Sequence, residues 1–266
     1  MPETVKFNSS QPPVKRRRFP IPRSRRLTCD VLHFHKQVPL CPHHRSIHLG
    51  LLDTLRKSVP QRISWPVLFL KAYGLLAREC PVFRQTWMPF PWPSIYEHDS
   101  SVGMLAIHRE YEGESWLFWG RFYSPESTSL IDLQQQLDRY QTAPVKETFK
   151  RYLQLSAIPN PIRRFLWWYN LNMSGSARSR RAGTFFMSTL SGRGAEIDMP
   201  PSFQTGVISY GPMDTQGRSR VTIAYDHRLM DGLLVADGLK RIEQILNGVL
   251  ADELSAMLSP GVLKSA

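Results

Sequence analysis

The stretch VTIAYDHRLMDGLLVADGLKRIEQIL, residues 221–246, joins three kinds of local structure within one short segment. Its alternating apolar residues predict a strand that ends before His227, and the apolar spacing after Gly232 predicts an amphipathic helix over 233–250. His227 and Asp231 fall in the turn between them. A neutral histidine ring can accept and return a proton near pH 7, and a strand end holds it rigidly. The stretch therefore predicts a strand, a turn and a helix that present a general base.

The rest of the chain alternates between helical and strand-like segments without an internal repeat. Apolar spacing predicts helices over 51–59, 64–80, 127–142, 145–155 and 161–173. Alternating apolar runs predict strands over 43–50, 82–88, 102–110, 115–123, 183–190, 205–211 and 220–226. The proline-rich residues 89–96 predict a turn. The pattern favours one α+β domain in which helices cover a mixed β-sheet.

The two ends of the chain differ in composition from its middle. We expect a flexible basic arm over residues 1–20, one domain over 21–252 and a C-terminal tail over 253–266. Prolines interrupt the basic stretch and oppose a helix there. Its charged residues are Lys15, Arg16, Arg17, Arg18, Arg23, Arg25 and Arg26.

Composition bounds the class of protein. The chain has 266 residues, 42% of them hydrophobic, which is enough for a full core. It contains no run of about 18 apolar residues and no apolar signal segment at its start, so we expect a cytoplasmic protein. Cys29, Cys41 and Cys80 are odd in number and fit no paired metal-ligand spacing, which indicates free thiols.

The formal net charge of +12 favours anionic partners, such as phosphates, carboxylates or acidic protein surfaces. A nucleic-acid or membrane binder driven by the basic arm is an alternative, but the arm reads more simply as a solvated tail. The basic and aromatic run RRFLWWYNL, residues 163–171, could also lie on a membrane surface. We favour a helix that covers the core, and we expect no nucleic-acid partner and no membrane contact.

Four segments resemble the chloramphenicol acetyltransferase-like superfamily, in particular the catalytic domain of dihydrolipoamide acyltransferases, the E2 components of 2-oxoacid dehydrogenases. DHRLMDG, residues 226–232, resembles the E2 signature Asp-His-Arg-x-x-Asp-Gly. GTFFMSTLSG, residues 183–192, resembles the E2 segment Gly-x-Phe-Thr-Ile-Ser-Asn-Leu-Gly. Residues 200–213 resemble the strand that follows in E2, and residues 64–87 resemble the early helix and strand of the family.

The resemblance implies acyl transfer from a thioester, without a metal and without a covalent acyl-enzyme. His227 is then the general base and Ser188 the hydrogen-bond donor to the oxyanion, while Asp231 and Gly232 hold the turn. Arg26, or Arg25, corresponds to an arginine that pairs with the aspartate in the chloramphenicol enzymes. The family also implies a homotrimer whose active site lies between subunits. The co-substrate would be acyl-CoA or an acyl carrier protein, with no bound cofactor, and the acceptor a small molecule with a hydroxyl, amine or thiol.

Two departures from E2 shape the expected function. The chain carries no lipoyl domain and has no room for a subunit-binding domain before residue 20, so we expect a stand-alone acyltransferase. A non-catalytic trimeric scaffold or binding protein of the same fold is the alternative. A zinc site is a further alternative, but we expect no metal, because histidines in a strand-like run lie more often at a surface. It would use His33, His35, Cys41, His43, His44 and His48.

Overall fold

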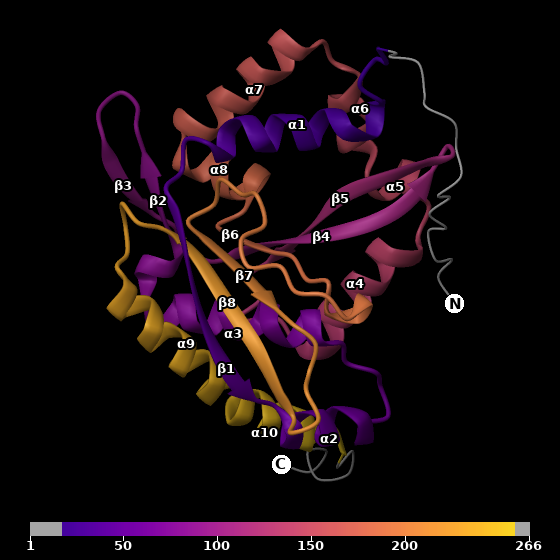
Figure 1. The fold of residues 1–266 in the computed structure, drawn as a ribbon, viewed down its shortest axis with the longest axis vertical. Coiled ribbons are helices and arrows are strands. Elements are labelled where there is room, and N and C mark those ends of the chain that lie inside the picture. The colour runs from indigo at the N-terminus through magenta and orange to yellow at the C-terminus, as the bar shows by residue number, and fades with distance from the viewer. Residues whose placement is uncertain (1–17, 259–266) are drawn as a thin grey trace, which may run out of the picture.

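The computed structural model describes residues 18–258, which form a six-stranded mixed sheet with helices on both faces (Figure 1). The sheet order is β1-β8-β7-β6-β4-β5. Its strands are β1 (Leu40–His48), β4 (Val102–Tyr111), β5 (Glu114–Tyr123), β6 (Phe185–Met187), β7 (Gly206–Tyr210) and β8 (Arg218–Asp226). A separate hairpin pairs β2 (Gln85–Met88) with β3 (Ser94–Glu97).

Helices connect the strands and cover the sheet. They are α1 (Arg23–His35), α2 (Gly50–Ser58), α3 (Trp65–Glu79), α4 (Leu130–Thr142), α5 (Val145–Thr148), α6 (Lys150–Ala157), α7 (Asn160–Asn172), α8 (Gly175–Ala182), α9 (Gly232–Asn247) and α10 (Val249–Leu258). Single 3-10 turns lie at Pro81–Arg84 and Ser191–Arg193.

The directions of the central strands decide where their ends point. β6 runs parallel to β4 and to β7, whereas β8 runs antiparallel to both β7 and β1. The chain therefore leaves β6 and β8 in opposite directions along the strands. This relationship separates the two residues that the sequence predicts to be catalytic.

Helix α3 packs against one face of the sheet and is buried along most of its length. Phe69 stacks on Tyr210 of β7 with ring centroids 4.3 Å apart, and Tyr73 stacks on Phe185 of β6 at 4.2 Å. Gly206 makes this approach possible, because a Cβ atom there would lie 1.7 Å from the Tyr73 hydroxyl. A helix that is buried all round explains why the segment is apolar at nearly every position.

Helices α1, α6, α7 and α8 lie on the opposite side of the sheet from α3 and α9 (Figure 1). Trp119 of β5 packs against Tyr152 of α6 at 5.6 Å, and Trp167 of α7 packs against Phe203 at 5.4 Å. A buried ion pair between Asp30 of α1 and Arg163 of α7 joins two of these helices. Most of this layer therefore comes from the segment between β5 and β6.

The structure confirms the predicted α+β fold of a mixed sheet covered by helices. The expectation that prolines keep the basic stretch from forming a helix is wrong for Arg23, Arg25 and Arg26, which lie in α1. Pro22 precedes the first turn, where its missing N–H costs nothing, and the buried Leu27 sets the helix against the core. Residues 1–17 of the predicted arm lie outside the described residues.

The chain remains helical beyond the predicted boundary at residue 252. Helix α9 ends before Gly248, and a second helix, α10, extends to Leu258 where a tail was predicted. Leu254 of α10 is fully buried, and Glu253 pairs with Lys71 of α3 at 2.7 Å. Residues 259–266 of the predicted tail are not described.

Two shorter segments differ from the sequence prediction. The strand predicted over 82–88 begins with a 3-10 turn and becomes β2 only at Gln85. The turn predicted over 89–96 contains the start of β3. These residues lack an apolar pattern and are exposed, and they form a strand because they pair with β2. Across residues 18–258, none of the helices has the length and apolar character needed to span a membrane.

Candidate active site

The candidate active site begins at the turn that follows β8. The backbone N–H of His227 donates to the carbonyl of Pro39 at 3.1 Å, and the N–H groups of Leu229 and Met230 donate to the carbonyl of Asp226. These bonds hold the turn, while the His227 side chain is exposed to solvent. In the described residues no hydrogen bond reaches the imidazole, so the ring is free to meet a substrate.

An ion pair inside the motif stiffens this turn. Asp226 is buried and accepts from Arg228 Nε at 2.8 Å and from Nη2 at 2.6 Å. The Arg228 guanidinium also lies 5.4 Å from the centre of the Trp87 ring. A bidentate pair restricts both side chains, which fixes the backbone on either side of His227. The sequence signal was the Asp-His-Arg run, but only the structure shows that the first and third residues bind each other.

Asp231 and Gly232 form the start of α9. The Asp231 carboxylate accepts a hydrogen bond from the Leu234 N–H at 3.1 Å, as an N-cap residue does. A Cβ atom on Gly232 would lie 3.0 Å from His43 Nε2, so glycine leaves room for that imidazole. Both residues therefore shape the helix start that follows the candidate base.

Sequence reasoning missed the aromatic surroundings of His227. The Tyr225 ring lies 5.4 Å from the His227 ring and 5.4 Å from the His43 ring. Burial raises the pKa of Tyr225 to about 12, so its phenol stays neutral, and Cys41 lies opposite it on β1. The signal was available in the sequence only as spacing, because Tyr225 lies two residues before His227.

Ser188 follows the last residue of β6. Its N–H donates to the carbonyl of Ile208 at 3.3 Å, and its side chain is half-buried. The next residue, Thr189, donates its hydroxyl to the carbonyl of Tyr210 at 2.9 Å. The strand end therefore holds the Ser188 backbone, while its hydroxyl has no hydrogen-bond partner among residues 18–258.

Ser188 and His227 do not meet within one chain. Continuing the β6–β7–β8 register places Ser188 level with Thr222, which is five residues before His227. At about 3.3 Å per residue, the two lie roughly 16 Å apart along the strand direction. One acyl carbonyl cannot touch both side chains at this separation.

The predicted pairing of Arg26 with Asp231 is absent from the described chain. Arg26 lies on α1 and donates to the carbonyl of Ser156 at 3.2 Å, and Arg25 of the same helix is exposed. Asp231 instead caps α9. The carboxylate that binds an arginine in this turn is Asp226, through Arg228.

The histidines considered for zinc are divided between two elements. His33 and His35 lie on α1, whereas His43 and His44 are neighbours on β1 and point to opposite faces. His44 lies 3.2 Å from an Arg220 nitrogen, away from the Tyr225 ring that His43 contacts. Within residues 18–258, histidine, cysteine and acidic side chains form no cluster of three that could hold a metal.

Comparison with solved structures places this arrangement in a known fold. The cubic core of a pyruvate dehydrogenase multienzyme complex has a TM-score of 0.67 and 17% identity, over 91% of this chain and 98% of that one. Dihydrolipoamide acetyltransferase of Azotobacter vinelandii has a TM-score of 0.66 and 17% identity, over 91% and 98% of the chains. A chloramphenicol acetyltransferase has a TM-score of 0.51 and 16% identity, over 82% and 94%.

The chain therefore has the chloramphenicol acetyltransferase-like fold, as the sequence resemblance predicted. Two of these three solved structures are acetyltransferases, and the other is the core of a pyruvate dehydrogenase complex. No protein-family model and no curated protein matches the chain by sequence.

Proposed function

We propose that the protein is an acyltransferase that moves an acyl group from a thioester to a hydroxyl, amine or thiol acceptor. The main support for this function is the position of His227, which is exposed at the end of β8. Asp226 and Arg228 fix the turn that holds it, and Asp231 caps the helix that follows. The fold supports this function, because two of the solved structures that share it are acetyltransferases. The A. vinelandii structure also bears on the proposal, since it addresses a serine, a histidine and an asparagine in that enzyme's mechanism.

In the proposed reaction, His227 takes the proton of the acceptor as its heteroatom attacks the thioester carbonyl carbon. The carbonyl electrons move to oxygen, and the Ser188 hydroxyl donates a hydrogen bond to that oxyanion. The carbonyl then re-forms, the carbon–sulfur bond breaks, and the imidazolium returns its proton to the leaving thiolate. A positioned base contributes about 10²- to 10⁴-fold and an oxyanion donor about 10²- to 10³-fold to the rate.

We propose that the complete site forms between two copies of this chain in a homotrimer. The separation of Ser188 from His227 along the sheet supports this arrangement, since a neighbouring subunit can supply the missing partner. One of the solved structures with this fold is itself a multienzyme core. The donor would be acyl-CoA or an acyl carrier protein, and both anions suit the net charge of +12.

A free-thiol release assay with a panel of acyl-CoAs and acceptors tests the function. We expect wild-type protein to release thiol with at least one pair, and His227→Ala to reduce the rate by about 10²- to 10⁴-fold. His108→Ala is the control, because His108 is an exposed histidine whose ring contacts only the nearby Ser115 and Glu110 side chains in the described residues. Equal rates in wild type and His227→Ala would refute the mechanism. No release with any pair would favour a scaffold of the same fold.

A further inference from the structure

The segment between β5 and β6 carries an unusual charge. Residues 148–195 contain one lysine and seven arginines but no aspartate or glutamate. They include α6, α7 and α8 in full. Arg163 is neutralised by Asp30 of α1, but the other cations have no acid within their own segment. The segment therefore presents positive charge that the chain does not balance locally.

A cavity of about 350 Å³ lies between these helices and β5. Its volume is in the range of small-molecule sites, about 300 to 1,000 Å³. Three cations, Arg121, Arg151 and Arg181, line the cavity, and no acidic residue does. The amide side chains of Gln154 and Asn170 also line it.

The three arginines lack acidic partners. None of them forms an ion pair with a carboxylate in residues 18–258, whose ion pairs involve other side chains. Arg121 Nε is buried without a hydrogen-bond partner, and its guanidinium lies 5.7 Å from the centre of the Tyr152 ring. Arg181 donates only to the Asn170 side chain. Leaving a buried guanidinium donor unpaired is costly, so an anion that accepts from it would bind favourably.

The cavity also has apolar lining residues. Leu155 and Ile158 come from α6 and the turn after it, and Leu166 and Trp167 come from α7. Leu166 is 37% exposed although it is a large apolar residue. An apolar group placed here would remove that surface from water.

We propose that this cavity binds a small amphiphilic anion, with a carboxylate or phosphate head against Arg121, Arg151 and Arg181 and an apolar body against Leu155, Leu166 and Trp167. None of the predicted catalytic residues lines the cavity, so the site is separate from the one proposed for acyl transfer. Its occupancy can be measured without any assumption about catalysis.

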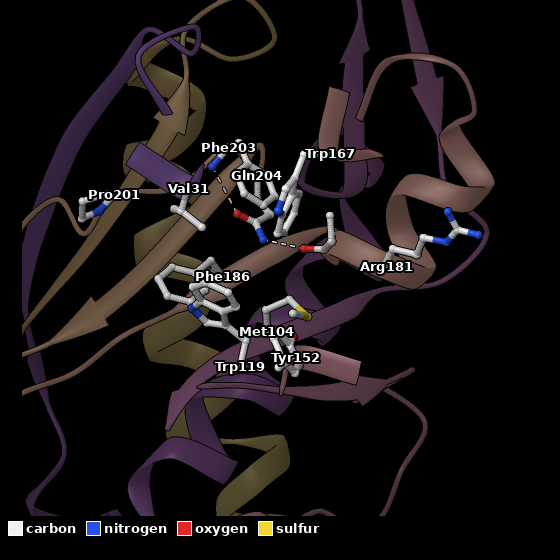
Figure 2. A pocket seen from close by; sticks show the side chains of 11 residues that line it. Val31, Met104, Trp119, Tyr152, Trp167, Arg181, Phe186, Pro201, Phe203 and Gln204 are labelled. Atoms are coloured by element: carbon white, nitrogen blue, oxygen red, sulfur yellow. Dashed lines mark hydrogen bonds between the residues drawn. The ribbon is translucent and has the colours of Figure 1, made fainter. Parts of the chain in front are cut away.

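A smaller cavity lies next to this site, between it and the sheet. It has a volume of about 20 Å³ and shares Tyr152, Trp167, Arg181 and Ala182 with the larger one. Figure 2 shows Arg181 pointing away from the other lining side chains, while Phe186, Trp119 and Met104 gather at the sheet. Gln204 closes the other side, where it donates to the carbonyl of Ala182 at 2.5 Å. Of these two cavities, the aromatic residues Trp119 and Phe186 line only the smaller one, at the sheet.

Isothermal titration calorimetry of the full chain tests the proposal. The probes are octanoate and octyl phosphate, with octanol and octyltrimethylammonium as neutral and cationic counterparts. We expect at least one anion to bind at one site per chain, and the octanol and the cation to bind at least tenfold more weakly. Comparison of the two anions decides between a carboxylate and a phosphate head.

Variants assign the binding to the cavity. We expect Arg181→Gln and Arg121→Gln each to weaken binding about ten- to a hundredfold, the loss of one charge-assisted bond. Arg62→Gln is the matched control, because Arg62 is exposed and lies outside the cavity. This substitution removes the same charge as the two test variants. Leu166→Trp, which fills part of the cavity with a larger apolar side chain, should weaken binding although all three arginines are still present.

Three results would overturn the proposal. These are octanol binding as tightly as octanoate, no binding of either anion to wild type, and equal affinities of Arg181→Gln, Leu166→Trp and wild type. Arg181 is exposed and Leu166 is partly exposed, so these variants report on the cavity even if Arg121→Gln fails to fold.

Discussion

Ser188 and His227 lie two strands apart on one sheet and roughly 16 Å apart along the strand direction, because β7 is parallel to β6 and antiparallel to β8. The relationship follows from strand direction, which no side-chain movement can change. A chemical step that uses both residues must therefore draw them from two copies of the chain.

Co-assembly of two inactive variants tests this requirement. When Ser188→Ala and His227→Ala chains with different tags are co-expressed, about a quarter of the subunit interfaces pair an intact serine with an intact histidine, if assembly is random. We expect the mixed assembly to recover thiol release toward that fraction of the wild-type rate, whereas each variant alone stays low.

The control is a preparation in which the two variants are purified separately and mixed only in the assay. Recovery in the co-expressed sample alone would show that activity depends on shared assembly. Mixed particles that carry both tags but show no recovery would contradict a site between subunits.

Removing the Asp231 carboxylate should destabilise the start of α9. Asp231→Ala deletes the acceptor for the Leu234 N–H, and we expect a loss of about 1 kcal/mol in the free energy of unfolding. Asp231→Asn keeps an accepting oxygen and should retain most of the stability. Urea unfolding measures both, with Asp237→Ala, an exposed change six residues later on α9, as the control. A fully stable Asp231→Ala would contradict the capping role.

A methyl group at position 206 should disturb the packing of α3 on the sheet. The Cβ of Gly206→Ala would lie 1.7 Å from the Tyr73 hydroxyl, and overpacking of this kind costs about 1 to 3 kcal/mol. Gly192→Ala is the control, because its Cβ would meet nothing within 4 Å. Thermal unfolding provides the comparison. Adding Tyr73→Phe should recover part of the loss, and no difference between the two glycine variants would rule the steric account out.

His98 should make the protein less stable in mild acid. Burial, assisted by Arg178, lowers its pKa from 6.5 to about 4. As the pH falls from about 6.5 to about 4, the unfolded chain takes up a proton that the folded chain does not, so the free energy of unfolding falls by about 3 kcal/mol. This contribution is fully present above pH 6.5 and is lost through that window.

His98→Gln separates this effect from the other titrating groups. The variant keeps a polar side chain beside Thr86, which lies 3.1 Å from His98 Nε2, and should lose about 3 kcal/mol less than wild type between pH 7 and pH 4. Urea unfolding at both pH values measures the difference. His108→Gln, a change to an exposed histidine, should behave as wild type. The same acid loss in His98→Gln and wild type would speak against the buried-histidine account.

Local patterns were sufficient for the regular elements with strong periodicity. The apolar run of α3, the hairpin of β4 and β5, and the strand, turn and helix around His227 agree with the sequence prediction, because the apolar pattern of each segment is set by its own residues. Sequence patterns did not predict the local structure where contact with another segment of the chain determines it. β3 is exposed along its length and exists through pairing with β2, and Arg25 lies in a helix that the surrounding prolines seemed to forbid.

By itself, the sequence determined the fold class and the Asp-His-Arg-Leu-Met-Asp-Gly turn, because both depend on interactions between residues close together in the chain. Only the tertiary structure decided that Arg26 turns to Ser156 and that Arg121 faces α6 and α7 across a cavity. Only strand direction decided that Ser188 and His227 lie apart. Contacts between distant segments depend on how elements pack, and one sequence pattern is compatible with several such packings.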